Sequence, residues 1–155
     1  GSGTPTFDTR SKGAFLGMTF STGKAEMAKA ILEGLTFELR VNLDLLQGAG
    51  VVIENLRAIG GGAKSDLWLQ MKADITGIPV LRPRITEAAA WGAAVLAGHG
   101  AGLFPDIATA VDERLVMEKE FVPDPRSAEQ YAQRYGLYCQ VYPALAGLLH
   151  QMDGN

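Results

Sequence analysis

Three consecutive glycines, at positions 60–62, stand between a short apolar run and a helix-like segment in AIGGGAKSDLWLQMKADI. Glycine has no side chain, so its backbone adopts positive φ readily and a ligand can touch the main chain. Ser65 follows as a good helix N-cap, and the free N–H groups at a helix start favour anions. A strand, a glycine turn and a capped helix together predict a phosphate or nucleotide site.

The phosphate loop of the Walker A type does not match this stretch. That motif needs Gly-x-x-x-x-Gly-Lys-Ser/Thr. Lys64 and Ser65 are present, but Ala63 and Ala58 stand where the two glycines belong. The Walker A interpretation therefore fails at both glycines.

A dinucleotide-binding fingerprint matches only in part. Gly60 and Gly62 fit the first two glycines of Gly-x-Gly-x-x-Gly, but Ser65 stands at the third. About 20 residues on, where an acid would bind the ribose, the chain has Arg82. An NADP-binding domain therefore stays open as an alternative, as does a tight turn that binds nothing.

The elements around the turn alternate between strands and helices. We expect a short strand or an extended piece at 13–20 and strands at 55–60 and 78–83. We expect helices at 24–47, 66–76, 87–102 and 127–151, and an exposed extended piece at 118–125. This order predicts an α/β fold with parallel pairing, in a single domain over residues 1–155.

Finer placements follow from the side chains. Leu67, Trp68, Met71 and Ile75 should form the inner face of the helix at 66–76. Cys139 should be a buried small hydrophobe on the last helix. The aspartates and the two histidines lack metal-ligand spacing, so no metal ligand is predicted.

Composition excludes several classes of function. The chain has 155 residues, a net charge of −3 and one cysteine. Its lysines and arginines are scattered along the sequence and form no basic cluster, so nucleic-acid binding is not expected. No apolar run reaches the roughly 18 residues of a membrane span, and the start is not a signal peptide. One cysteine allows no internal disulfide, so a cytoplasmic setting is expected.

Five segments together resemble the carboxy-terminal domain of the FGGY carbohydrate kinases, the sugar kinases that include xylulokinase, gluconokinase and glycerol kinase. The family usually carries Glu-Arg before the Thr-Pro of the first segment, and this sequence does not. The segments are, in chain order, GTPTFD, RSKGAFLGMTFSTGKAEMAKAILEGLTFELR, AIGGGAKSDLWLQMKADITGIPV, EAAAWGAAVLAGHGAG and FVPDPRSAEQYAQRYGLYCQVYPAL.

The resemblance implies part of an actin-like ATPase (ribonuclease-H-like) domain, an incomplete sheet with flanking helices. ATP would bind in a cleft beside the glycines. By position, Gly60, Gly61, Gly62 and Ala63 would back the adenine and ribose, and Lys64, Ser65 and Asp66 would edge the same pocket. The resemblance therefore moves the expected ligand contact from the phosphates to the nucleoside end of ATP.

The family's other working parts are not found in the sequence. Asp8-Thr9 is followed by arginine and Gly3-Thr4 by proline, so neither an Asp-x-Gly-Thr nor a Gly-Thr-Ser phosphate loop is present. We therefore expect no catalytic residue here, Mg²⁺ bound by residues outside this chain, and a sugar substrate bound by an amino-terminal domain that is absent. Since phosphoryl transfer depends on positioning and charge neutralisation, the chain alone should be inactive.

Two further expectations follow from a sheet that lacks strands. Its open edge invites pairing, so we expect a homo-oligomer or a separate amino-terminal half as partner. The alternative function is an interaction or oligomerisation module derived from a kinase half that no longer binds nucleotide.

Overall fold

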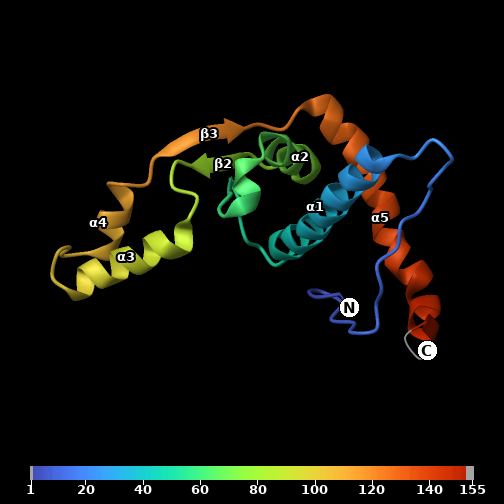
Figure 1. Cartoon of the computed structure of the whole chain (residues 1–155), viewed down its shortest axis with the longest axis horizontal. Coiled ribbons are helices and arrows are strands. Elements are labelled where there is room, and N and C mark those ends of the chain that lie inside the picture. Colours follow the sequence, from blue (N-terminus) through green and yellow to red (C-terminus); the bar gives the residue numbers. More distant parts are fainter. Residues whose placement is uncertain (1, 153–155) are drawn as a thin grey trace. The chain divides into compact units, whose positions relative to one another are not determined.

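The computed structural model describes residues 2–152 and divides into two compact units (Figure 1). One unit comprises the chain up to Val52 together with the chain from Pro125 onward, and the other runs from Ile53 to Asp124. The predicted single domain over residues 1–155 stays a prediction.

The first unit is built on two long helices, α1 (Lys24–Gly48) and α5 (Pro125–Gln151). At the start of α1, the Glu26 carboxylate accepts a hydrogen bond from the Gly23 N–H at 2.9 Å. This bond satisfies one of the backbone N–H groups that lack a partner at the start of every helix. The two predicted helices at 24–47 and 127–151 are confirmed within two residues at their ends.

Aromatic side chains join α1 to α5. Phe37 of α1 is buried, and the rings of Tyr131, Tyr135 and Tyr138 of α5 have centroids 5.2–6.2 Å from its own. Aromatic pairs at such distances stabilise beyond the area they bury. The tyrosines at helical spacing are therefore packing residues.

Of the two alternatives for residues 13–20, a short strand or an extended piece, the strand is wrong. These residues form no strand, and Phe15, Leu16, Met18 and Phe20 are exposed. An extended segment becomes a strand only when a neighbouring strand accepts its hydrogen bonds. The apolar residues of 13–20 therefore suggested a strand, but no neighbouring strand pairs with this segment.

The second unit holds a three-stranded sheet in the order β1-β2-β3, formed by β1 (Leu56–Arg57), β2 (Val80–Pro83) and β3 (Met117–Phe121). β1 pairs with β2 in parallel, and α2 (Asp66–Thr76) lies between them in the chain. This is the strand–helix–strand unit that the sequence predicts.

β3 corrects the predicted pairing, because it runs antiparallel to β2. The exposed extended piece expected at 118–125 is in part this strand. The ladder has an irregularity between Arg82 and Pro83, where proline has no N–H to donate. The register sets Arg82 opposite Lys119, which brings two cations together.

The core of the second unit lies between the sheet and α2. Its members are Ala58, Ala63, Leu69, Ala73, Val80 and Phe121. On α2, Met71 and Ile75 are buried as predicted, but Leu67 is 68% exposed. Leu69 occupies the inner face instead, because Leu67 lies two residues, or about 200°, away from it around the helix.

Two more helices complete this unit. The alanine-rich α3 (Ala88–Gly100) contacts the short α4 (Ile107–Asp112). Gly98 of α3 lies directly against the Phe104 ring, and no Cβ would fit between them. The absence of a side chain at Gly98 thus allows the close approach of Phe104, which lies in the loop between α3 and α4.

Candidate nucleotide site

Gly61 and Gly62 begin a short 3₁₀ turn, η1 (Gly61–Lys64), between β1 and α2. Gly60 precedes it with φ 75° and ψ −167°, a backbone conformation that is essentially restricted to glycine. The Ala63 N–H donates to the Gly60 carbonyl at 3.1 Å, and the Gly60 N–H donates to the Thr86 carbonyl at 2.8 Å. Gly60 is therefore required by the backbone itself.

Gly62 is required by packing. A Cβ added there would lie 2.9 Å from a carbon of the Trp68 ring, closer than real side chains approach. The Lys72 ammonium lies 4.3 Å from the centroid of the same ring, a favourable cation–π distance. The Trp68 ring is thus engaged by Gly62 and Lys72 within the chain.

Gly61 differs from both of its neighbours. A Cβ added there would meet no described atom within 4 Å, its φ is not positive, and the residue is exposed. Nothing in the described chain covers this peptide unit. Gly61 therefore presents open main chain on the side where a Cβ would project.

The helix after the turn begins as the sequence predicts. Ser65 is the N-cap of α2, and its Oγ accepts the Trp68 N–H at 3.3 Å. Asp66 lies in the first turn, where a negative charge suits the helix dipole. Gly77 ends the helix in the left-handed conformation, so the predicted range 66–76 is confirmed.

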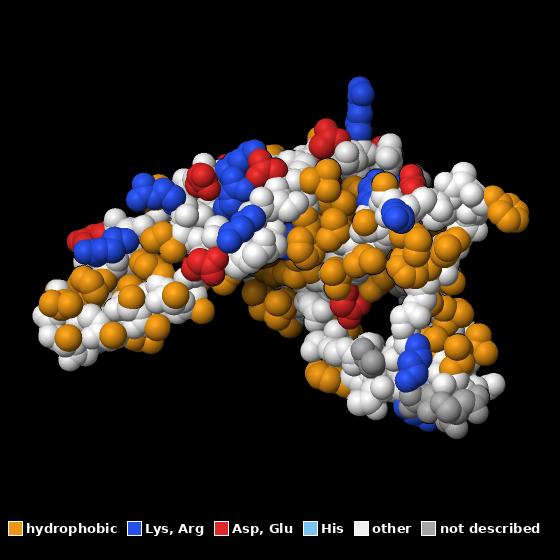
Figure 2. Space-filling view, in the orientation of Figure 1, with side chains coloured by type: hydrophobic (Ala, Val, Ile, Leu, Met, Phe, Trp, Pro, Cys, Tyr) orange, Lys and Arg blue, Asp and Glu red, His pale blue; other side chains and the backbone are white. Residues whose placement is uncertain are grey.

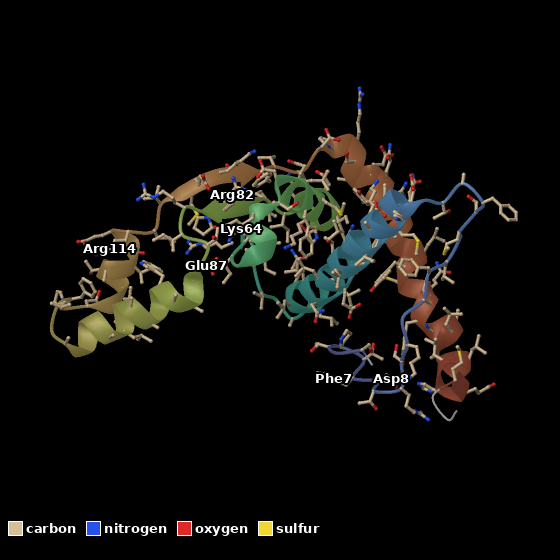
Figure 3. All side chains as sticks on the ribbon, in the orientation of Figure 1. Phe7, Asp8, Lys64, Arg82, Glu87 and Arg114 are labelled. Carbon is tan, nitrogen blue, oxygen red and sulfur yellow. The ribbon has the colours of Figure 1, made fainter. Side chains whose placement is uncertain are left out.

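Arg82, labelled near Lys64 in Figure 3, is the centre of an ion network beside the turn. The Arg82 guanidinium donates through Nη1 to Asp66 Oδ1 at 2.5 Å and to the Ala63 carbonyl at 3.3 Å, and through Nε to Glu118 Oε2 at 3.2 Å. The Lys119 ammonium donates to Asp66 Oδ2 at 2.6 Å. Figure 2 shows such Lys, Arg, Asp and Glu side chains intermixed over β2 and β3.

These bonds shift the titration of the groups involved. The hydrogen bonds from Lys119 and then Arg82 lower the pKa of Asp66, and the bond to Asp66 raises the pKa of Arg82. Each bond favours the charged form of its partner. Both carboxylate oxygens of Asp66 are thus engaged by cations, one from β2 and one from β3.

The seven predicted site residues lie together in one segment. Ala63 is 1% exposed as a whole residue, so its backbone is buried together with its methyl group. Lys64 is exposed and pairs with Glu87 at 3.3 Å, both side chains being about two-thirds exposed (67% and 70%); such a surface pair is worth little by itself. The assignment of all seven residues to a ligand stays a prediction.

Sequence reasoning missed Arg82 as a part of this site. Arg82 was considered only as the residue at the position where a dinucleotide-binding domain carries an acid that binds the ribose. The helical and strand periodicities do not show that residue 82 lies across from residue 119 and next to the turn. Only the β2–β3 register reveals this, and no local sequence signal encodes it.

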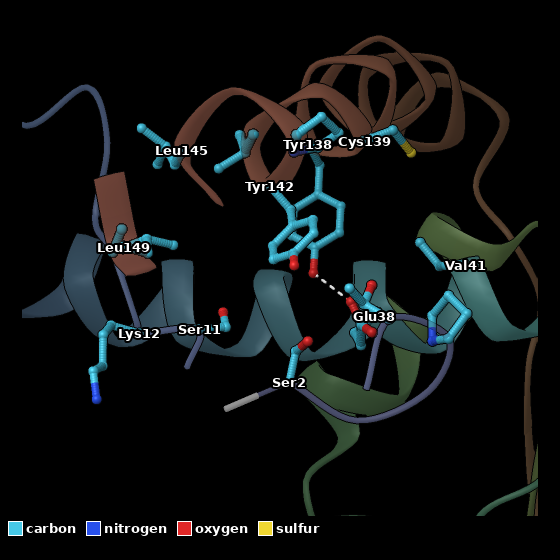
Figure 4. Close-up of a pocket in the computed structure, with 15 residues that line it drawn as sticks. Ser2, Ser11, Lys12, Glu38, Val41, Tyr138, Cys139, Tyr142, Leu145 and Leu149 are labelled. Carbon is cyan, nitrogen blue, oxygen red and sulfur yellow. Dashed lines mark hydrogen bonds between the residues drawn. The ribbon is translucent and has the colours of Figure 1, made fainter. Parts of the chain in front are cut away.

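A separate cavity of about 380 Å³ lies within the first unit (Figure 4). Tyr138 donates to a Glu38 carboxylate oxygen at 2.8 Å in its wall, and the buried Ser2 Oγ has no partner among the described residues. Cys139 also lines it, and this side chain is exposed. The predicted burial of Cys139 is wrong, because the tyrosines take the inner face of α5.

Asp8 links the amino-terminal segment to α5. Its Oδ2 lies 2.6 Å from His150 Nε2 and accepts the Tyr142 hydroxyl at 2.7 Å. The hydrogen bonds with His150 and then Tyr142 lower the pKa of Asp8 to about 2. These partners are 142 and 134 residues away in sequence, so no spacing rule could have found them.

Two negative findings apply to residues 2–152. Within them, no three His, Cys, Asp or Glu side chains gather where they could hold a metal ion. None of their helices combines the length and the apolar character needed to cross a bilayer.

Comparison with known proteins identifies the family. The model of the FGGY family of carbohydrate kinases, C-terminal domain, matches residues 1–101. A xylulose kinase of Staphylococcus epidermidis is 34% identical over 142 residues, which is 92% of this chain. A glycerol kinase of Saccharolobus islandicus is 40% identical over 124 residues, or 79% of this chain. The chain therefore belongs to the FGGY family of carbohydrate kinases.

Solved structures agree with the fold. The xylulose kinase from Lactobacillus acidophilus has a TM-score of 0.82 at 29% identity and covers 96% of this chain, and the glycerol kinase from Plasmodium falciparum has a TM-score of 0.71 at 23% identity and covers 88%. The predicted class, part of an actin-like ATPase domain, is confirmed. The chain spans only 29% of the Staphylococcus relative, 25% of the Saccharolobus relative, and 30% and 28% of the two solved chains.

Proposed function

We propose that this chain supplies the nucleoside-binding surface of an ATP-dependent sugar kinase, with Gly61 as its contact point. The open Gly61 peptide unit is the observation that supports this most directly. Its neighbours Gly60 and Gly62 have structural reasons to be glycine, whereas nothing in the described chain requires one at 61. A flat base or ribose resting on position 61 supplies the missing reason.

The nucleoside end of ATP fits this surface better than the phosphates. The three cations in and beside the turn already pair with carboxylates: Lys64 pairs with Glu87, and Arg82 and Lys119 both pair with Asp66. A phosphate would have to compete with a carboxylate for each of them. A nucleoside needs only bare backbone and a shaped apolar surface with a few polar groups.

Transfer of the γ-phosphoryl group requires parts that the sequence does not contain. Phosphate loops, bound Mg²⁺ and a general base do the positioning and the charge neutralisation. We propose that an amino-terminal domain supplies them and binds the sugar. The isolated chain should therefore bind ATP without phosphorylating xylulose, gluconate or glycerol.

Titration of ATP and adenosine into the chain, followed by isothermal calorimetry, tests the binding. Gly61→Val places a branched side chain on the open unit and should abolish binding. Gly136→Val is the matched control, since a Cβ at this exposed glycine of α5 also meets nothing within 4 Å. Equal binding by wild type and Gly61→Val would refute the site.

A coupled assay for ADP release tests the inactivity. The chain at micromolar concentration, with ATP, Mg²⁺ and each of the three substrates in turn, should release no ADP above the rate without substrate. Substrate-dependent release would show that the chain carries its own phosphate and metal groups. The titration of ATP and adenosine would still decide whether Gly61 forms a nucleoside site.

A further inference from the structure

One side chain, Arg82, connects the glycine turn to the start of α2 and to β3. It contacts the Ala63 carbonyl of the turn, the Asp66 carboxylate of the helix and the Glu118 carboxylate of the strand. Its side chain is only 15% exposed. A planar guanidinium can bind several acceptors in fixed directions, which a lysine ammonium cannot do.

The turn is held at Ala63 in two ways. The Ala63 methyl group is buried in the core cluster with Leu69 and Val80. Its carbonyl is held by Arg82. Gly61 lies two residues earlier, in a segment without side chains, so its position depends on this anchor and on the Gly60 bond to Thr86.

We propose that Arg82 is a positioning residue for the nucleoside surface: by holding the Ala63 carbonyl and Asp66 together, it fixes the turn with the Gly61 backbone exposed, without touching the ligand itself. This inference rests on the proposed function. The contrasting role is a phosphate contact, in which Arg82 would leave its carboxylates and bind the ligand.

Adenosine separates these two roles because it has no phosphate. If Arg82 positions the turn, Arg82→Met should weaken ATP and adenosine by the same factor, roughly fivefold or more, as expected for the loss of hydrogen bonds from a charged donor. Arg82→Lys keeps the positive charge but loses the planar guanidinium with its several N–H donors. This variant should recover only part of the affinity for both ligands. A loss confined to ATP, and reduced by added salt, would instead identify a phosphate contact and overturn the inference.

Lys119→Met is the matched control. Lys119 donates to the other oxygen of Asp66, but no contact joins it to the turn. Its loss should change the adenosine affinity less than about twofold, since it removes one exposed ion pair. A loss equal to that of Arg82→Met would mean that charge near Asp66, and not the bond to the turn, sets the affinity.

Hydrogen exchange tests the positioning without any nucleotide. The amides of Ala63 and Ser65 donate to the carbonyls of Gly60 and Gly62, at 3.1 and 3.4 Å. In Arg82→Met and Arg82→Lys these two amides should exchange faster than in wild type, while the α1 amides should not change. Unchanged exchange at both amides in the two variants refutes the positioning role. If the wild-type chain binds neither ligand, the proposed function fails, and the exchange rates still decide what Arg82 does.

Discussion

Replacing each glycine of the turn by alanine should give three different results. Gly60→Ala forces a side chain into a conformation at φ 75° and ψ −167°, which costs about 1–3 kcal/mol for a non-glycine residue. Gly62→Ala places its Cβ 2.9 Å from the Trp68 ring, and overpacking of this kind also costs about 1–3 kcal/mol.

Gly61→Ala should not destabilise the chain. A Cβ there meets no described atom within 4 Å, and the backbone φ is acceptable to any residue. Alanine restricts the unfolded chain more than glycine does, so the expected change lies between zero and a gain of about 1 kcal/mol. The order of stability is therefore Gly61→Ala, then wild type, then the other two variants.

Urea unfolding followed by tryptophan fluorescence measures these differences. The chain has two tryptophans, and both Trp68 and Trp91 lie in the unit that contains the turn. Combining Gly62→Ala with Trp68→Leu should cost less than the sum of the two changes, because the clash is removed. If Gly61→Ala destabilised the chain as much as Gly60→Ala, the Gly61 unit would be covered in solution, and the nucleoside surface would not exist.

Two further predictions concern the rest of the molecule. The pKa of Asp8 falls from 3.8 to about 2 on folding, chiefly through the hydrogen bonds with His150 and Tyr142, so the first unit should keep this stabilisation above about pH 4 and lose it as the pH falls toward 2. Helix content by circular dichroism during urea unfolding should show this loss between pH 5 and pH 2 in the wild type, and Asp8→Asn should lack it. Leu69→Ala empties a fully buried position in the core of the second unit and should lower its unfolding free energy by about 2–5 kcal/mol, whereas the same change at the exposed Leu67 should cost under about 1 kcal/mol. An equal loss at both positions, measured by urea unfolding, would contradict the burial assigned to α2.

Local elements were predictable because their signals are local. Ser65 and Gly77 mark the two ends of α2. The strand at 13–20 failed for a physical reason, since alternation alone does not supply a hydrogen-bonding partner. The expected parallel pairing was wrong for β3, and the expected burial was wrong for Cys139. Both depend on which other element occupies the neighbouring position.

The site was predictable in part for the same reason. The glycine turn lies in seven consecutive residues, so a sequence pattern can find it. Arg82 and Lys119 reach Asp66 from positions 16 and 53 residues away, and the pairing of β2 with β3 brings them there. Asp8 and its partners on α5 illustrate the same limit in the other unit.

The differences among the three glycines bear on what the turn is for. If the run served only to make a tight turn, each member would be needed by the free chain, as Gly60 is for its φ and Gly62 is for the Trp68 ring. Gly61 has neither need, and an alanine there should even add stability. The proposed function supplies such a need at this position, because a nucleoside that rests on position 61 requires uncovered backbone there. Position 61 is therefore where structure and binding can be separated, because a side chain there should leave folding intact and block the ligand.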